Sequence, residues 1–230
     1  MVGDIDAASL AALLDRTFGG LPAKSRLTAV PDVEAAKPPQ RASIVLDVPQ
    51  TVVTFGGPGI KRNDPDFMAA YLVNHILGDG SSDSRLYREV REKRGLAYSV
   101  SDSLVWLDHA ALFIGGTATR ADRAGETVDL IENEIRRLAD SGPTAGELAE
   151  AKNYLNSSFA LNLDTSVKIA AFMVQLQLDG LGTDYFTKRP EMINVVTLAD
   201  AQRVAKRLLD KGLLVTVVGK PRGVAASTAN

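Results

Sequence analysis

Residues 77–100 read LGDGSSDSRLYREVREKRGLAYSV, and they join three kinds of local signal. A loop of glycine and serine at 78–82 leads into a short charged helix, which we predict over residues 83–94. Gly95 suits the left-handed position that commonly ends a helix. A β-prone apolar run then begins at Leu96. This stretch, called the signature stretch below, therefore predicts a loop, a helix and a strand in direct succession.

The predicted helix of the signature stretch has a narrow apolar stripe and a wide charged face. Leu86 and Val90 are four residues apart and form the buried stripe. Arg91 falls in the last turn, and Tyr98 lies seven residues later in the next strand, so both side chains are expected to project toward one edge. An exposed charged helix without a specific task is the simpler interpretation of the same pattern. The other charged side chains face solvent or a partner: Arg85, Arg88, Glu89, Glu92 and Lys93.

The signature stretch resembles the corresponding segment in the second, non-catalytic half of the M16 (pitrilysin-type) zinc metallopeptidases, a group that includes mitochondrial processing peptidase. In those enzymes an arginine and a tyrosine seven residues apart bind substrate opposite the zinc of the other half. Arg91 and Tyr98 stand at these two positions, so the resemblance assigns them to substrate binding. Arg94 is close in sequence, but the seven-residue spacing favours Arg91.

The resemblance extends over most of residues 50–157. The segments PQTVVTFGGPGIKRNDPD, LGDG and GPTAGELAEAKNYL look like family positions in family order. Gly78, Gly80 and Ser81 match a place where some members carry a longer glycine-rich loop that contacts substrate. These three residues are therefore further candidates for substrate binding, although the loop is short here.

The composition is that of an ordinary globular protein and excludes several classes of function. The 230 residues are 45% apolar and 23% charged, with a formal net charge of −2, so no basic excess indicates nucleic acid as a partner. The absence of cysteine excludes disulfides and thiolate metal sites and leaves the compartment open. No apolar run approaches the length of a membrane span, and MVGDID lacks the features of a signal peptide.

The first 40 residues resemble the end of a preceding unit. The opening MVGD suggests the tail of a strand, and a helix is predicted over residues 6–18. Four prolines within residues 19–40 indicate a linker. The segment LLVTVVGKPRG at 213–223 repeats the pattern of MVGD, which suggests an internal duplication in a parent protein.

We therefore expect two parts in this chain. Residues 1–40 are expected to be a strand remnant, helix and linker from a preceding M16 unit, and residues 41–225 to be the main α+β domain. Without the preceding unit the helix is expected to dock on another copy of the chain, or to fray. Its apolar face consists of Leu10, Leu13, Leu14 and Phe18.

The order of predicted elements determines the fold class. Strands are predicted at 43–48 and 50–55, as two strands or one broken strand, and a helix capped by Asn63 or Asp64 follows them. Beyond the signature stretch come strands at 97–106 and 110–117, five helical segments (122–140, 144–161, 166–178, 184–195 and 198–209) and a final strand. This order favours an α+β fold with a largely antiparallel sheet covered on one face by helices, and the resemblance implies the same unit.

The sequence lacks the residues that hold zinc in the M16 family. A His-x-x-Glu-His helix there places two imidazoles on one face beside the glutamate. His75 and His109 are the only histidines, and neither has a second histidine three or four residues away. We therefore expect no metal and no other cofactor on this chain, and the resemblance implies zinc in a partner half. His75 shares a helix face with Leu72 and Ile76 and is expected to be packed in the core or at its rim.

Three further features have structural rather than chemical interpretations. The loop at 56–59 lacks the Lys-Ser or Lys-Thr pair of a phosphate-binding loop. The serines of the signature stretch lack a nucleophile pattern, and Ser81 or Ser82 is expected to cap the helix. Trp106 and Phe113 are expected to form a cross-strand core pair.

Two functions from different classes fit these observations. In the first, the chain is the substrate-binding, non-catalytic half of an M16 zinc peptidase. It encloses a peptide together with a half that bears His-x-x-Glu-His, on the same parent chain or on a separate subunit. In the second, the chain is a protease-like scaffold or assembly subunit that cleaves nothing, as in respiratory-complex core subunits. The presence of both Arg91 and Tyr98 favours the first.

Overall fold

The computed structural model describes residues 2–35, 40–79 and 82–224 as a five-stranded sheet with helices on one face. The strands are β1 (Gln40–Val45), β2 (Thr51–Pro58), β3 (Ala97–Trp106), β4 (Ala111–Thr119) and β5 (Leu214–Gly219). They lie in the order β1-β5-β2-β4-β3, and each neighbouring pair is antiparallel except β1 and β5. The predicted largely antiparallel α+β fold is therefore confirmed.

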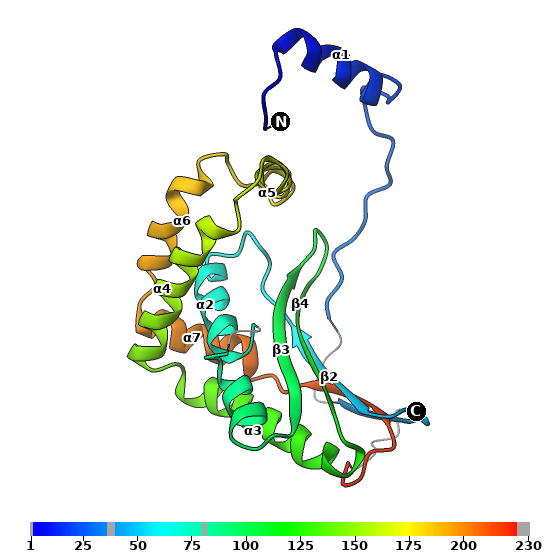
Figure 1. Cartoon of the computed structure of the whole chain (residues 1–230), viewed down its shortest axis with the longest axis vertical. Coiled ribbons are helices and arrows are strands. Elements are labelled where there is room, and N and C mark those ends of the chain that lie inside the picture. Colours follow the sequence, from blue (N-terminus) through cyan, green and yellow to red (C-terminus); the bar gives the residue numbers. More distant parts are fainter. Residues whose placement is uncertain (1, 36–39, 80–81, 225–230) are drawn as a thin grey trace.

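The helices cover one face of this sheet and leave the other face to the chain's N-terminal segment (Figure 1). They are α2 (Phe67–Leu77), α3 (Ala124–Ser141), α4 (Ala145–Leu161), α5 (Ser166–Leu178), α6 (Tyr185–Asn194) and α7 (Leu198–Leu209), with a short 3₁₀ turn at Ala121–Arg123. The core lies between the two layers, where Phe55 of β2 and Phe113 of β4 meet at 6.2 Å between ring centroids. No helix in the described residues is long and apolar enough to cross a membrane.

The start of α2 differs from the prediction. Asn63 and Asp64 lie in a turn, and the helix begins only at Phe67. Asp64 precedes Pro65, a pattern that would also suit a cap before a helix, so the partners of Asp64 decide its role. Its carboxylate accepts the backbone N–H of Asp66 at 2.8 Å and pairs with Arg207 of α7 at 2.6 Å. The first bond closes the turn that precedes α2, and the ion pair fastens this turn to α7.

The predicted core pair of Trp106 and Phe113 is wrong. The register of β3 and β4 places Phe113 opposite Leu104 and places Trp106 opposite Ala111. Phe113 is buried in the core, whereas Trp106 is half-buried and forms a T-shaped pair with Phe67, 5.0 Å between ring centroids. The two aromatic residues therefore form no cross-strand pair, although both pack in the same hydrophobic core.

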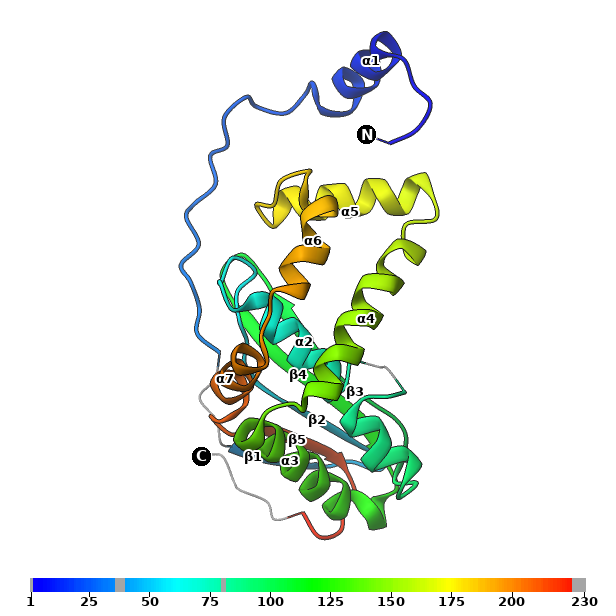
Figure 2. The same cartoon turned by 90° about the vertical axis from the view of Figure 1, so that its left-hand side faces the viewer.

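The N-terminal segment stands apart from the helix and sheet layers. Helix α1 (Ala7–Phe18) is capped by Asp6, close to the predicted boundary, and lies away from the sheet (Figures 1 and 2). None of its residues is buried. The following extended segment touches the body at Asp32, which pairs with Lys61, and at Val33, whose N–H donates to the carbonyl of His109 at 2.8 Å. Val2 and Gly3 form no strand, and Met1 lies outside the described residues.

Candidate functional site

The helix of the signature stretch is a π-helix over most of its length, which the sequence did not predict. After two α-helical residues, the element η1 spans Tyr87–Glu92, and the Lys93 N–H donates to the carbonyl of Arg88 at 3.0 Å. Leu86 and Val90 are fully buried, as predicted, and Gly95 ends the helix at φ +58°. Short π-helical turns occur frequently at functional sites because the extra residue reorients the side chains that follow.

The structure brings Arg91 and Tyr98 together, as the sequence predicted. The Arg91 guanidinium carbon lies 4.6 Å from the centroid of the Tyr98 ring and 4.9 Å from the centroid of the Tyr87 ring. Arg91 also donates a hydrogen bond to the Tyr87 hydroxyl. Two aromatic rings therefore fix a cation at the junction of η1 and β3.

A β-bulge presents Tyr98 to solvent. Ala97 pairs with Thr119 and Val100 pairs with Thr117, so β3 holds one more residue than β4 between these two pairs. The side chains of Thr117 and Thr119 bind the carbonyls of Ser99 and Leu96, both at 2.6 Å. Bulges of this kind redirect a side chain. Tyr98 is 81% exposed as a result.

Arg91 has no carboxylate partner in the described part of the chain. Glu89 instead pairs with Lys93 at 2.6 Å and with Arg94 at 2.5 Å. Hydrogen bonding from Lys93, followed by that from Arg94, lowers the pKa of Glu89. Arg94, the alternative to Arg91 by closeness in sequence, is therefore paired with Glu89.

Tyr87 is a site residue that the sequence reasoning missed. Its signal was its position four residues before Arg91, a spacing that places two helical side chains side by side. The Tyr87 hydroxyl accepts the Arg91 hydrogen bond, and its ring forms one of the two aromatic faces around the guanidinium. Tyr87 thus positions Arg91.

Arg85 and Glu147 join the helix of the signature stretch to α4. Arg85 binds the two carboxylate oxygens of Glu147 through Nε and Nη2, both at 2.7 Å. Burial alone would raise the pKa of Glu147, but hydrogen bonds from Arg85 and Thr144 lower it to about 2. Arg85 and Glu89, both predicted to face solvent or a partner, form ion pairs within the chain instead.

Gly78 is buried at the end of α2, beneath the signature stretch. A Cβ atom at this position would approach Cδ1 of Leu86 to 2.9 Å and Oδ1 of Asp102 to 3.3 Å, so the packing favours glycine. Its carbonyl accepts the Asp102 N–H at 2.6 Å. Substrate binding by Gly78 stays a prediction. Gly80 and Ser81, the other two loop candidates, lie outside the described residues.

The histidines occupy separate structural positions. His75 is 7% exposed, stacks on Tyr154 at 4.8 Å between ring centroids and bonds Asp79 through Nδ1 at 2.5 Å, so the predicted packed histidine is confirmed. His109 lies in the β3–β4 turn beside Asp32. The described residues contain no group of three or more His, Asp or Glu side chains that would hold a metal ion.

Asp102 of β3 is a buried carboxylate next to the site. It is 2% exposed, and neither of its oxygens has a hydrogen-bond partner among the described residues. Burial, reinforced by the charge of Asp79, raises the pKa of Asp102 well above its usual value of 3.8. Such a group destabilises the fold progressively as the pH rises above its pKa in the unfolded chain.

Asp102→Asn is expected to stabilise the protein at neutral and higher pH. The amide is neutral at every pH, so the variant avoids the cost that wild type incurs as the pH rises from about 4 toward the raised pKa of Asp102. Urea unfolding between pH 4 and pH 8 should show a difference that is smallest near pH 4 and grows with pH. The exposed Asp108→Asn is the matched control. A pH-independent difference for Asp102→Asn would contradict this account.

Comparison with known proteins identifies the family. The family profile described as the peptidase M16 inactive domain matches residues 1–155. This chain belongs to that family. The M16 resemblance of the signature stretch is thereby confirmed, as is the fold it implied.

Relatives of this M16 inactive domain include proteins named as proteases and one named as a non-peptidase. An uncharacterized zinc protease of Streptomyces coelicolor is 30% identical over 181 residues, which cover 77% of this chain and 39% of that protein. A Helicobacter pylori protein named a non-peptidase homolog is 31% identical over 120 residues, covering 52% of this chain and 28% of that protein.

A solved structure extends the likeness to nearly the whole chain. The peptidase M16 inactive domain from Pseudomonas fluorescens superposes with a TM-score of 0.84 at 26% identity and covers 98% of this chain and 54% of that chain. The M16 inactive domain described here thus spans about half, or less, of the length of these relatives.

Proposed function

We propose that this M16 inactive domain is the substrate-binding, non-catalytic half of a zinc peptidase. It completes a peptide-cleaving chamber with a half that carries the His-x-x-Glu-His motif and holds the zinc. The observation that carries the proposal is the Arg91 guanidinium, fixed between two tyrosine rings at 4.6 and 4.9 Å with no carboxylate partner in the described residues. A cation held in this way is prepared to bind an external oxygen atom.

The two side chains would have different tasks. Arg91 has N–H donors beyond the one bound to Tyr87, and these suit a carbonyl or carboxylate oxygen of a peptide. Tyr98, on the bulge of β3, carries an exposed hydroxyl that suits hydrogen bonding to an oxyanion formed during peptide cleavage. Stabilisation of developing charge by a fixed donor lowers the activation barrier more than it strengthens ground-state binding.

A scaffold without proteolytic activity is the second candidate. The relative from Helicobacter pylori that is named a non-peptidase homolog supports it. In that case Arg91 and Tyr98 would contact a partner surface instead of a peptide under cleavage. A complete His-x-x-Glu-His motif in the accompanying half would exclude a pure scaffold.

We also propose that residues 1–40 belong structurally with the preceding M16 unit. The exposed apolar face of α1 supports this division, since Leu14 is 42% and Phe18 is 55% exposed. Burial of that face against the preceding unit would remove apolar surface from water.

One reconstitution experiment tests both proposals. The chain is mixed with the half that bears His-x-x-Glu-His, and peptide cleavage is measured together with amide hydrogen exchange. We expect cleavage only in the mixture, and slower exchange across α1 once the complex forms. Full cleavage by the zinc-bearing half alone would contradict the chamber proposal. Exchange in α1 that is already as slow as in β2 for a monomeric chain would contradict the domain proposal.

A further inference from the structure

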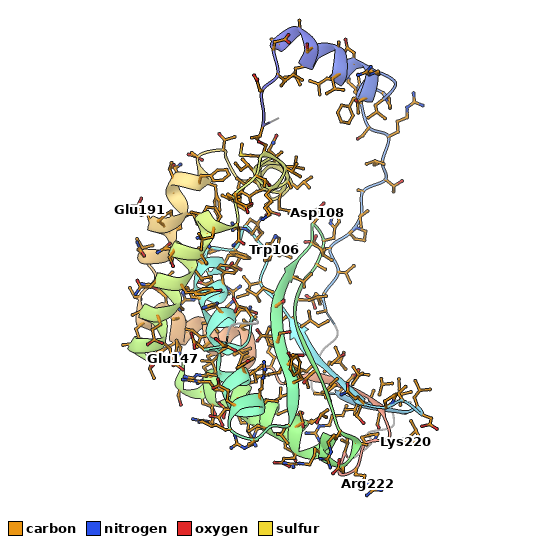
Figure 3. The ribbon with its side chains drawn as sticks, in the orientation of Figure 1. Trp106, Asp108, Glu147, Glu191, Lys220 and Arg222 are labelled. Carbon is orange, nitrogen blue, oxygen red and sulfur yellow. The ribbon has the colours of Figure 1, made fainter. Side chains whose placement is uncertain are left out.

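A large cleft lined by aromatic side chains lies at the Trp106 end of β3, whereas Tyr98 lies at the other end of this strand. The cleft has a volume of about 570 Å³, opens to solvent, and is lined by the first turns of α2, the end of β3 and helices α4, α5 and α6. Figure 3 shows Trp106 at this end of β3, where the sheet approaches α5. Protein interiors rarely leave voids larger than a water molecule, whereas ligand pockets typically measure about 300–1,000 Å³. The cleft is therefore the size of a binding pocket.

The lining of the cleft concentrates the chain's aromatic residues. Six of the 13 aromatic residues (7 Phe, 5 Tyr and 1 Trp) line it, although they come from five separate elements. Such walls bind large apolar or aromatic groups through burial and edge-to-face contacts. The six are Phe67, Tyr71, Trp106, Phe159, Phe172 and Tyr185.

The charges in the cleft are mostly positive. The guanidinium carbon of Arg62 lies 4.2 Å from the Phe67 ring centroid, and that of Arg189 lies 4.3 Å from the Phe159 ring centroid. Lys168 adds a third cation at the rim, where it pairs with Asp164 at 2.8 Å. Asp179 is the single acidic residue among those that line the cleft, and it lies 3.8 Å from Nε of Arg62. Asp179 accepts hydrogen bonds from Trp106 at 3.2 Å and Gln175 at 2.8 Å. Arg189 donates to the Leu155 carbonyl at 2.8 Å and has no carboxylate partner among the described residues, so the cleft suits an apolar group with an acidic neighbour.

We propose that this cleft is a second peptide-binding site, which takes a large apolar or aromatic side chain of an acidic peptide. The exposed amide side chains of Asn162 and Gln175 stand at its rim. Each donates one N–H within the chain, to the Ser158 carbonyl at 3.1 Å and to Asp179 at 2.8 Å, and its second N–H suits a peptide carbonyl. The eight steps of β3 from Tyr98 to Trp106 span about 26 Å, so an extended peptide of about eight residues would reach from the cleft to Tyr98. The proposal goes beyond peptide cleavage and does not depend on it.

The fluorescence of Trp106 reports peptide binding, because Trp106 is the only tryptophan in the chain and lines the cleft. The probe is a blocked, tryptophan-free acidic peptide with one central phenylalanine, titrated into the isolated chain while Trp106 emission is recorded. We expect saturable binding, and an affinity lower by about tenfold or more when alanine replaces the phenylalanine. Tyr154→Phe, at an exposed tyrosine that does not line the cleft, should leave this binding unchanged.

Two variants on α5 locate the bound peptide. Ala171 is exposed and lines the cleft, whereas Val174 is 56% exposed three residues away and does not line it. Ala171→Glu should weaken peptide binding by about tenfold or more, while Val174→Glu, which adds the same charge, should not.

Three results would overturn the proposal. The first is equal affinity for the phenylalanine and alanine peptides. The second is equal weakening by the two α5 variants. The third is a dimer in sedimentation whose dissociation changes Trp106 emission, because a second copy would then occupy the cleft.

Discussion

Replacing Tyr98 with phenylalanine is expected to lower kcat of the reconstituted peptidase by about 10²–10³-fold, the usual effect of losing one oxyanion donor. The melting temperature of the chain should change little. Tyr98 is 81% exposed, and phenylalanine keeps the ring face on which Arg91 lies. Peptide cleavage at saturating substrate, beside thermal unfolding of the same preparation, measures both quantities.

Tyr154→Phe is the matched control for this change. Tyr154 is 51% exposed and stacks on His75 in α2, away from Arg91. The same loss of a hydroxyl there should leave kcat within about twofold of wild type. If Tyr98→Phe lowers the melting temperature so far that unfolding of the variant explains its lost activity, Tyr98 is a structural residue.

Leu86→Ala is expected to destabilise the chain by about 2–5 kcal/mol, because it removes a fully buried side chain and leaves a cavity. Leu86 lies beneath η1 and beside Gly78, so its loss loosens the helix that presents Arg91. Activity and stability should therefore fall together, in contrast to Tyr98→Phe. Urea unfolding measures the loss of free energy.

The control for Leu86→Ala is Leu107→Ala in the β3–β4 turn. Leu107 is 58% exposed, so its truncation should change the free energy of unfolding by less than about 0.5 kcal/mol. A Leu86→Ala variant as stable as Leu107→Ala would show that the helix of the signature stretch is not held on the core through Leu86.

The secondary structure was largely predictable because local patterns agree with tertiary packing in most elements. Helix α4, for example, begins with a capping box in which Thr144 and Glu147 satisfy each other's backbone N–H groups. The start of α2 was mispredicted because Asp64 bonds to Arg207, which lies 143 residues later in the chain. Local patterns contain no information on such a partner.

Arg91 and Tyr98 were predictable as members of the site, whereas Tyr87 and the geometry of the site were not. The spacing of Arg91 and Tyr98 suggested that they would meet, and they do. The π-helical form of η1 and the bulge at Tyr98 depend on how β3 pairs with β4 and how Leu86 packs, and neither leaves a local pattern. The aromatic cleft was missed for the same reason, since its walls come from elements far apart in sequence.

The central claim is that Arg91 and Tyr98 act on a peptide held between this domain and a zinc-bearing half. The most direct test is the cleavage rate of the reconstituted enzyme when the chain carries Arg91→Ala and Tyr98→Phe together. The account predicts a fall of about 10²-fold or more, with unchanged zinc content and complex formation. Cleavage by the double variant at the wild-type rate would contradict it.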